Sequence, residues 1–208
     1  LIGNPTILKM LDLLQSFLLI EFNWSILETV AVIFSLLYVF LAAQQNNLCW
    51  PAALISVSIY IYICFDAKLY AETALQIFYF IMAIYGFYSW RKNNSELQIS
   101  TWSIGKHLYI ILLGTILTFF LGFLFTNFTD AEMPLIDSFT TVFSVFATYM
   151  VVKKILSNWL YFIVIDIISI YMYFSRDLHL TSLLFLLYTF IALAGFIKWN
   201  RLSIKLND

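Results

Sequence analysis

The sequence predicts an all-α integral membrane protein: seven transmembrane helices form two parallel three-helix bundles joined by a linker helix, and an amphipathic helix precedes them. Three observations predict this fold: an apolar composition, seven long apolar runs, and a repeat of the first three runs by the last three. Of the 208 residues, 62% are hydrophobic and 11% are charged, whereas a soluble domain carries about a quarter charged residues. The surplus apolar side chains must therefore face lipid.

The apolar runs have the length of membrane-spanning helices, which need about 17–25 residues to cross about 30 Å of hydrocarbon. A membrane β-barrel would instead alternate polar and apolar residues in segments of about 10 residues, and these runs do not alternate. The prolines Pro5, Pro51 and Pro134 lie outside the run interiors, so we expect no proline kinks. The predicted spans are residues 27–45, 50–66, 71–90, 106–126, 135–153, 158–174 and 180–199.

The segment before the first span is too polar for a signal-peptide core, because residues 7–22 mix Lys9, Asp12, Gln15 and Glu21 with apolar residues. We predict that residues 1–23 form an amphipathic helix in the membrane interface. An additional short span is the alternative interpretation.

An internal repeat relates two parts of the chain, because residues 28–90 align without a gap with residues 137–199. Each copy contains three spans, and the unmatched span at 106–126 returns the second copy to the orientation of the first. The two halves are therefore predicted to be parallel, related by an axis along the membrane normal. The matched pairs include Trp50 with Trp159, Tyr79 with Tyr188, Gly86 with Gly195 and Trp90 with Trp199. The predicted divisions are the amphipathic helix at 1–23, the first repeat at 24–90, a loop and linker helix at 91–130, the second repeat at 131–199 and a cytoplasmic tail at 200–208.

Basic residues are distributed unequally between the two predicted sides of the membrane. Lys9, Lys68 and Arg176 fall on one side. The other side carries Arg91, Lys92, Lys106, Lys153, Lys154, Lys198, Arg201 and Lys205. Because cytoplasmic loops are enriched in Lys and Arg, we expect a cytoplasmic C-terminus and an N-terminus outside.

Helical spacing places a set of aromatic and polar side chains on related faces of the two halves. Asp166 is the only carboxylate near the centre of a span. A charged group there costs at least about 2.5–3.5 kcal/mol and usually faces a cavity or a partner. Interhelical hydrogen bonds of Asp166 or Gln76, an interface position of the tryptophans and simple packing of the hydroxyls are the alternatives. The candidate binding residues are Trp50, Tyr60, Gln76, Tyr79, Thr148, Trp159, Asp166, Ser169 and Tyr188.

The types of residue in the spans limit the substrates and activities that the protein can have. No Lys, Arg or His lies near the middle of a run, which argues against a phosphorylated or strongly anionic substrate. Aromatic and acidic residues suit a flat or cationic ligand instead. A net charge of −1 argues against nucleic acid as a partner. No catalytic pair, zinc-protease motif or metal-ligand cluster is present, so we expect neither an enzyme nor a metal or cofactor.

The segment WPAALISVSIYIYICFDAKLYAETALQIFYFIMAIYGFYSW (residues 50–90) and its counterpart at 158–199 resemble the PnuC family of bacterial nicotinamide riboside transporters. The resemblance covers residues 24–200. It implies facilitated diffusion of the riboside across the bacterial inner (cytoplasmic) membrane, cytoplasmic phosphorylation that traps it, and a homotrimer. Uptake of another vitamin such as thiamin or riboflavin, with or without proton coupling, is the alternative.

The resemblance also implies roles for residues. Tryptophan and tyrosine rings would hold the cationic aromatic ring of the riboside. Gln76 and Asn46 would bind the ribose hydroxyls, and Asp166 would balance the positive charge.

Overall fold

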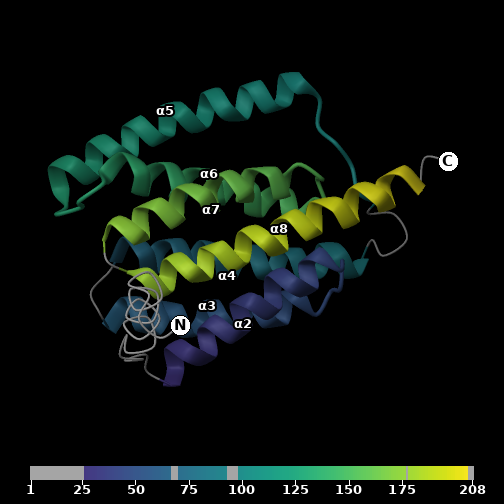
Figure 1. Ribbon diagram of the computed structural model, residues 1–208, viewed down its shortest axis with the longest axis horizontal. Coiled ribbons are helices and arrows are strands. Elements are labelled where there is room, and N and C mark those ends of the chain that lie inside the picture. Colours follow the sequence, from purple (N-terminus) through teal and green to yellow (C-terminus); the bar gives the residue numbers. More distant parts are fainter. Residues whose placement is uncertain (1–25, 67–69, 93–97, 177, 206–208) are drawn as a thin grey trace, which may run out of the picture.

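The computed structural model describes residues 26–66, 70–92, 98–176 and 178–205, and these residues form seven α-helices (Figure 1). The all-α prediction is therefore confirmed. The predicted amphipathic helix at 1–23 lies outside the described residues and stays a prediction. The helices are α2 (Ile26–Ala43), α3 (Cys49–Asp66), α4 (Tyr70–Lys92), α5 (Ile104–Phe128), α6 (Pro134–Val152), α7 (Asn158–Ser175) and α8 (His179–Lys205).

Within the described residues, six helices are long and apolar enough to cross a bilayer, namely α2, α3, α5, α6, α7 and α8. The helix α4 has 23 residues, a length of about 34 Å at about 1.5 Å per residue. Its composition is more polar because it carries Glu72, Gln76 and several tyrosines. The helix α8 continues to Lys205, so the predicted tail at 200–208 begins inside a helix.

The turns that join α2 to α3 and α6 to α7 have the same backbone geometry. Gln45 and Lys154 have positive φ angles of 56° and 51°, and each ends its helix in the left-handed region that glycine usually occupies. In each turn the next residue donates its N–H to the carbonyl five residues back, at 3.0 Å and 2.9 Å. The two turns lie at matched positions of the sequence repeat.

Helix packing separates the chain into two groups. In the first group α2 packs on α3 and α3 on α4, and in the second α6 packs on α7 and α7 on α8. The groups meet where α2 contacts α8 and where α4 contacts α6. The helix α5 packs against α6 and lies along one edge of the molecule (Figure 1).

The two ends of the helix bundle differ in charge. The end where α8 finishes and α5 begins, here called the basic end, carries Arg91, Lys106, Lys153, Lys154, Lys198 and Arg201 among the described residues. The opposite end, here called the acidic end, carries Glu28, Asp66, Glu72, Asp130, Glu132, Asp137 and one cation, Arg176. This distribution is the one expected if the basic end faces the cytoplasm.

The largest hydrophobic core lies near the basic end, between the two groups of helices. Its centre consists of Trp50, Trp90, Trp159 and Trp199, which are at most 2% exposed. Small residues such as Ala42, Ala83 and Ala192 surround the indole rings. The acidic half of the same interface is not filled in this way, and it contains the cavity described below.

Candidate functional site

A cavity of about 540 Å³ lies between the two groups of helices. Every described helix except α5 contributes to its wall. The cavity extends from Glu28 and Thr181, near the acidic end, to Trp50 and Trp159 near the basic end. Its size falls in the range of small-molecule sites, about 300–1,000 Å³.

The structure brings most of the predicted binding residues together in this cavity. Two candidates lie elsewhere: Asn46 is exposed in the turn between α2 and α3, where its Oδ1 accepts the Leu48 N–H at 2.9 Å. Ser169 is only 2% exposed but does not line the cavity. The candidates that line the cavity are Trp50, Tyr60, Gln76, Tyr79, Thr148, Trp159, Asp166 and Tyr188.

Asp166 lines the cavity from the middle of α7 and is 4% exposed. Within the described residues, it makes no hydrogen bond and no ion pair, so the expected alternative of a helix-joining hydrogen bond is not found there. A carboxyl group so deeply buried needs a compensating partner, and the space next to this one is the cavity.

One serine–tyrosine contact crosses between the halves beside the cavity. The Ser35 and Tyr188 hydroxyl oxygens are 2.5 Å apart, which joins α2 to α8. The repeat pairs Ser35 with Ser144 and Tyr188 with Tyr79, and both of these matched residues line the same cavity from α6 and α4. The matched residues therefore lie on the cavity wall in both groups of helices.

The rings in the wall come from both halves. Tyr173 stacks on Phe185 with ring centroids 5.2 Å apart and planes 18° from parallel. Phe185 in turn meets Tyr188 edge to face. Together with Trp50 and Trp159, these rings offer a flat or cationic ligand several aromatic surfaces.

Charged groups in the cavity wall are acidic. Among the described lining residues, Glu28 and Asp166 carry carboxyl groups, and none is a lysine, arginine or histidine. Arg176, the one described cation at the acidic end, does not line the cavity. Its guanidinium donates two hydrogen bonds to Asp137, at 3.1 Å and 2.8 Å, and this partner raises the pKa of the arginine.

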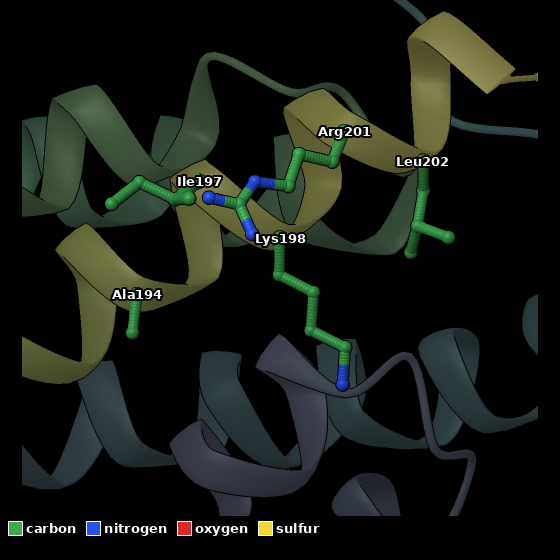
Figure 2. A pocket seen from close by; sticks show the side chains of 5 residues that line it. All are labelled: Ala194, Ile197, Lys198, Arg201 and Leu202. Atoms are coloured by element: carbon green, nitrogen blue, oxygen red, sulfur yellow. The ribbon is translucent and has the colours of Figure 1, made fainter.

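A second hollow, on the outside of α8, is a poor candidate for the site (Figure 2). It is an open depression of about 530 Å³ near the basic end. Its described lining residues, Ala194, Ile197, Lys198, Arg201 and Leu202, all belong to α8. A surface served by a single helix cannot enclose a solute, in contrast to the cavity between the halves.

Sequence reasoning missed Ser35 and Tyr38, which also line the cavity. The repeat held a signal for Ser35, because its matched residue Ser144 lies one helical turn before the candidate Thr148. Tyr38 had no comparable signal, since its matched residue is Ala147. No group of three or more His, Cys, Asp or Glu residues that could hold a metal ion occurs in the part of the chain that the structure describes.

Long apolar helices around a central cavity with aromatic, hydroxyl and carboxyl groups are typical of a class of protein, the α-helical membrane proteins that bind or carry small molecules. The family model described as "Nicotinamide mononucleotide transporter" matches residues 25–201. The chain therefore belongs to this transporter family, which confirms the family resemblance found in the sequence.

Curated relatives and a solved structure agree with this family. The nicotinamide riboside transporter PnuC of Escherichia coli K12 is 28% identical over an alignment that covers 86% of each chain. A protein of the same name from Neisseria mucosa is 24% identical, with 85% of this chain and 72% of the relative covered. A crystal structure of the vitamin B3 transporter PnuC matches with a TM-score of 0.72 and 21% identity, covering 92% of this chain and 88% of the other.

Proposed function

We propose that this protein carries nicotinamide riboside across the membrane and rejects the phosphorylated mononucleotide. The observation that carries the proposal is the charge of the cavity wall, which has two carboxyl groups and no basic side chain among its described residues. The family description names the mononucleotide, whereas the curated relatives are named for the riboside. The wall favours the riboside.

The electrostatic argument depends on Asp166. At an effective dielectric constant of about 20, a unit charge about 8 Å from a carboxylate gains or loses about 2 kcal/mol. When Asp166 is ionised, the cationic ring of the riboside would gain this energy, and a phosphate group would lose it for each negative charge. Phosphate sites normally supply arginine, lysine or several backbone N–H groups, and this wall supplies no such cation.

The proposed ligand position follows from the wall. The cationic ring lies against the tryptophan and tyrosine rings near Asp166, and the ribose hydroxyls bond to Gln76 and to the hydroxyl groups of Thr148 and Ser144. Asn46 lies at the exposed turn, so its predicted ribose contact is not part of this proposal.

The transport mechanism needs two halves that move relative to each other. The proposed arrangement is two parallel three-helix bundles, α2–α4 and α6–α8, joined by α5, with α4 as the seventh crossing. The matching turns at Gln45 and Lys154 and the contacts of α2 with α8 and of α4 with α6 support it. The basic end then faces the cytoplasm, the N-terminus lies outside, and the membrane is the bacterial inner membrane.

We further propose facilitated diffusion by a homotrimer, with cytoplasmic phosphorylation trapping the riboside. The exposed apolar face of α5, which includes Leu112, Phe119 and Phe123, is available for lipid or for neighbouring subunits. Thiamin is the second candidate substrate, because it too has a cationic aromatic ring and the acidic wall would accept it. Riboflavin lacks such a charge and fits the same wall less well.

Uptake into liposomes tests the proposed function. Purified protein is reconstituted, and labelled nicotinamide riboside or its mononucleotide is added outside without any ion gradient. The riboside should equilibrate across the membrane, and the mononucleotide should stay outside. Entry of the mononucleotide at a similar rate would refute the substrate assignment, and uptake that requires a proton gradient would refute facilitated diffusion.

A further inference from the structure

Four buried indole rings form a continuous chain across the two halves, here called the tryptophan cluster (Trp50, Trp90, Trp159 and Trp199). The rings of Trp50 and Trp90 meet edge to face with their centroids 5.2 Å apart, and those of Trp159 and Trp199 do the same at 5.4 Å. The ring centroids of Trp90 and Trp199, which come from opposite halves, are 6.2 Å apart. The chain of rings therefore crosses the interface between the halves without a gap.

The tryptophan cluster lies where the cavity ends. Trp50 and Trp159 belong to the cavity wall, whereas Trp90 and Trp199 do not. The Trp50 ring packs against Gly86 and the Trp159 ring against Gly195. Trp90 and Trp199 follow these glycines by one helical turn on α4 and α8, so they lie one turn nearer the basic end than the two wall rings. A solute in the cavity meets the cluster before it can reach that end.

Two glycines allow the wall tryptophans to pack closely against neighbouring helices. A Cβ atom at Gly86 would clash with ring atoms of Trp50, and one at Gly195 would lie 2.8–2.9 Å from the ring atoms of Trp159. Only a residue without a side chain lets each indole lie so close to the neighbouring helix. The ring positions are therefore tightly specified on both halves.

The two matched residues Trp90 and Trp199 differ in the polar contacts that hold their indole rings. The Trp90 indole N–H donates to the Val152 carbonyl at 3.1 Å, and the Lys154 ammonium lies 4.7 Å from the Trp90 ring. Burial lowers the pKa of this lysine. The Trp199 indole N–H has no hydrogen-bond partner within the described residues, and the position matched to Lys154 is the uncharged Gln45.

We propose that the tryptophan cluster is the barrier that closes the basic end of the cavity, and that Trp90 and Trp199 are positioning residues that hold Trp50 and Trp159 closed. This inference rests on the proposed transport function, because a barrier matters only if a solute must pass. The solute leaves toward the basic end when the rings part, and the less fastened Trp199 side moves first.

The labelling of a native cysteine, Cys49, can measure the opening of the basic end. Cys49, next to Trp50, is 0% exposed, and the sequence contains one other cysteine, Cys64. A thiol reacts as its thiolate, which needs water, so Cys49 reacts only when the basic end opens. In a Cys64→Ser background, a membrane-impermeant maleimide is applied to intact spheroplasts and to inside-out vesicles, and the labelling rate of Cys49 is measured from each side.

Trp199→Ala should raise the Cys49 labelling rate at least tenfold from the side of the basic end and leave the rate from the other side unchanged. Trp199→Phe keeps an aromatic ring and should stay close to the parent protein. Trp102→Ala is the matched control, because Trp102 is near the same end and packs on His107 outside the cluster. Gly195→Ala, which drives a methyl group into the Trp159 ring, should also raise labelling.

Equal Cys49 labelling rates in the Trp199→Ala and Trp102→Ala proteins would contradict the proposed barrier. A rise of the same size from both sides would also contradict it, because it would indicate a general loss of packing. If Trp199→Ala protein does not accumulate, Gly195→Ala decides by the same criteria. Riboside uptake by the Cys64→Ser parent is measured in parallel. One-sided labelling without uptake counts against the proposed function alone, and uptake with unchanged labelling counts against the barrier alone.

Discussion

At the scale of single residues, the charge of the ligand depends on Asp166, whose side chain faces the cavity without a described partner. A carboxyl group with 4% exposure is costly to maintain in a span unless a ligand, a proton or water compensates it. The described lining residues of the cavity include no lysine, arginine or histidine that could neutralise it. The position therefore matches a cationic solute better than an anionic one.

Asp166→Asn should weaken riboside binding about tenfold, or about 1.4 kcal/mol, because the amide keeps the shape of the side chain and removes its negative charge. Isothermal titration of the detergent-solubilised protein measures the change. Asp130→Asn, an exposed acid outside the cavity, removes the same charge and should leave the affinity unchanged. Unaltered binding by Asp166→Asn would show that Asp166 does not contact the ligand's charge.

Gln76→Ala should weaken riboside binding by about twofold to tenfold, since a net hydrogen bond is worth about 0.5–1.5 kcal/mol. The same titration applies, with melting temperature as a check that the fold is intact. Gln44→Ala, at the exposed end of α2, is the matched control. If the two glutamine variants bind equally well, Gln76 is a packing residue rather than a ligand contact.

Individual residues also show how far the sequence could predict the site. Helical spacing correctly grouped Asp166 with Trp159, because both periodicity and the cost of a mid-span charge point inward. It also grouped Ser169, which is buried away from the cavity, because spacing gives the face of a helix but not which neighbour covers it. Asn46 was assigned by family resemblance alone, and its turn exposes it.

At the scale of elements, the seven apolar runs predicted the seven helices, because lipid requires every backbone group in a span to bond within its own helix. The helix α8 extends beyond the predicted span 180–199, since the apolar pattern stops at Trp199 while the polar residues after it still form helix. The neighbours of each helix could not be predicted from periodicity, because almost every face of these helices is apolar.

The helix α5 packs closely against α6 at a glycine. A Cβ atom at Gly114 would lie 2.7 Å from Cζ of Phe143 on α6, whereas one at Gly105 would meet nothing within 4 Å. Gly114→Ala should therefore lower stability by about 1–3 kcal/mol, and Gly105→Ala should leave it unchanged or raise it slightly. Thermal unfolding in detergent measures both, and equal melting temperatures would show that α5 is not closely packed at Gly114.

At the scale of the whole molecule, the two groups of helices share their turns and their glycine–tryptophan contacts. The sequence repeat matched the ring and glycine residues of these contacts, whereas it held no signal for the turns, because Gln45 and Lys154 differ in type. The repeat could not predict the size of the cavity between the halves. The volume left open depends on side chains that differ between the two copies, such as Asp166, which the alignment pairs with Val57.

The separation of basic and acidic ends predicts the orientation of the molecule. A fluorescent protein fused after the C-terminal residue should mature and fluoresce in bacterial cells, whereas an alkaline phosphatase fused there should be inactive. Cytoplasmic location of the basic end is the reason. An active phosphatase fusion would place the C-terminus outside and reverse the proposed direction of the cavity.

Two halves that enclose an acidic, ring-lined cavity should distinguish a cationic nucleoside from its phosphate ester. Calorimetric titration of the purified protein with nicotinamide riboside and with the mononucleotide compares the two ligands directly. The riboside should bind at least a hundredfold more tightly, a difference of about 2.7 kcal/mol. Binding of the mononucleotide within tenfold of the riboside would contradict the assignment of this cavity to an unphosphorylated cation.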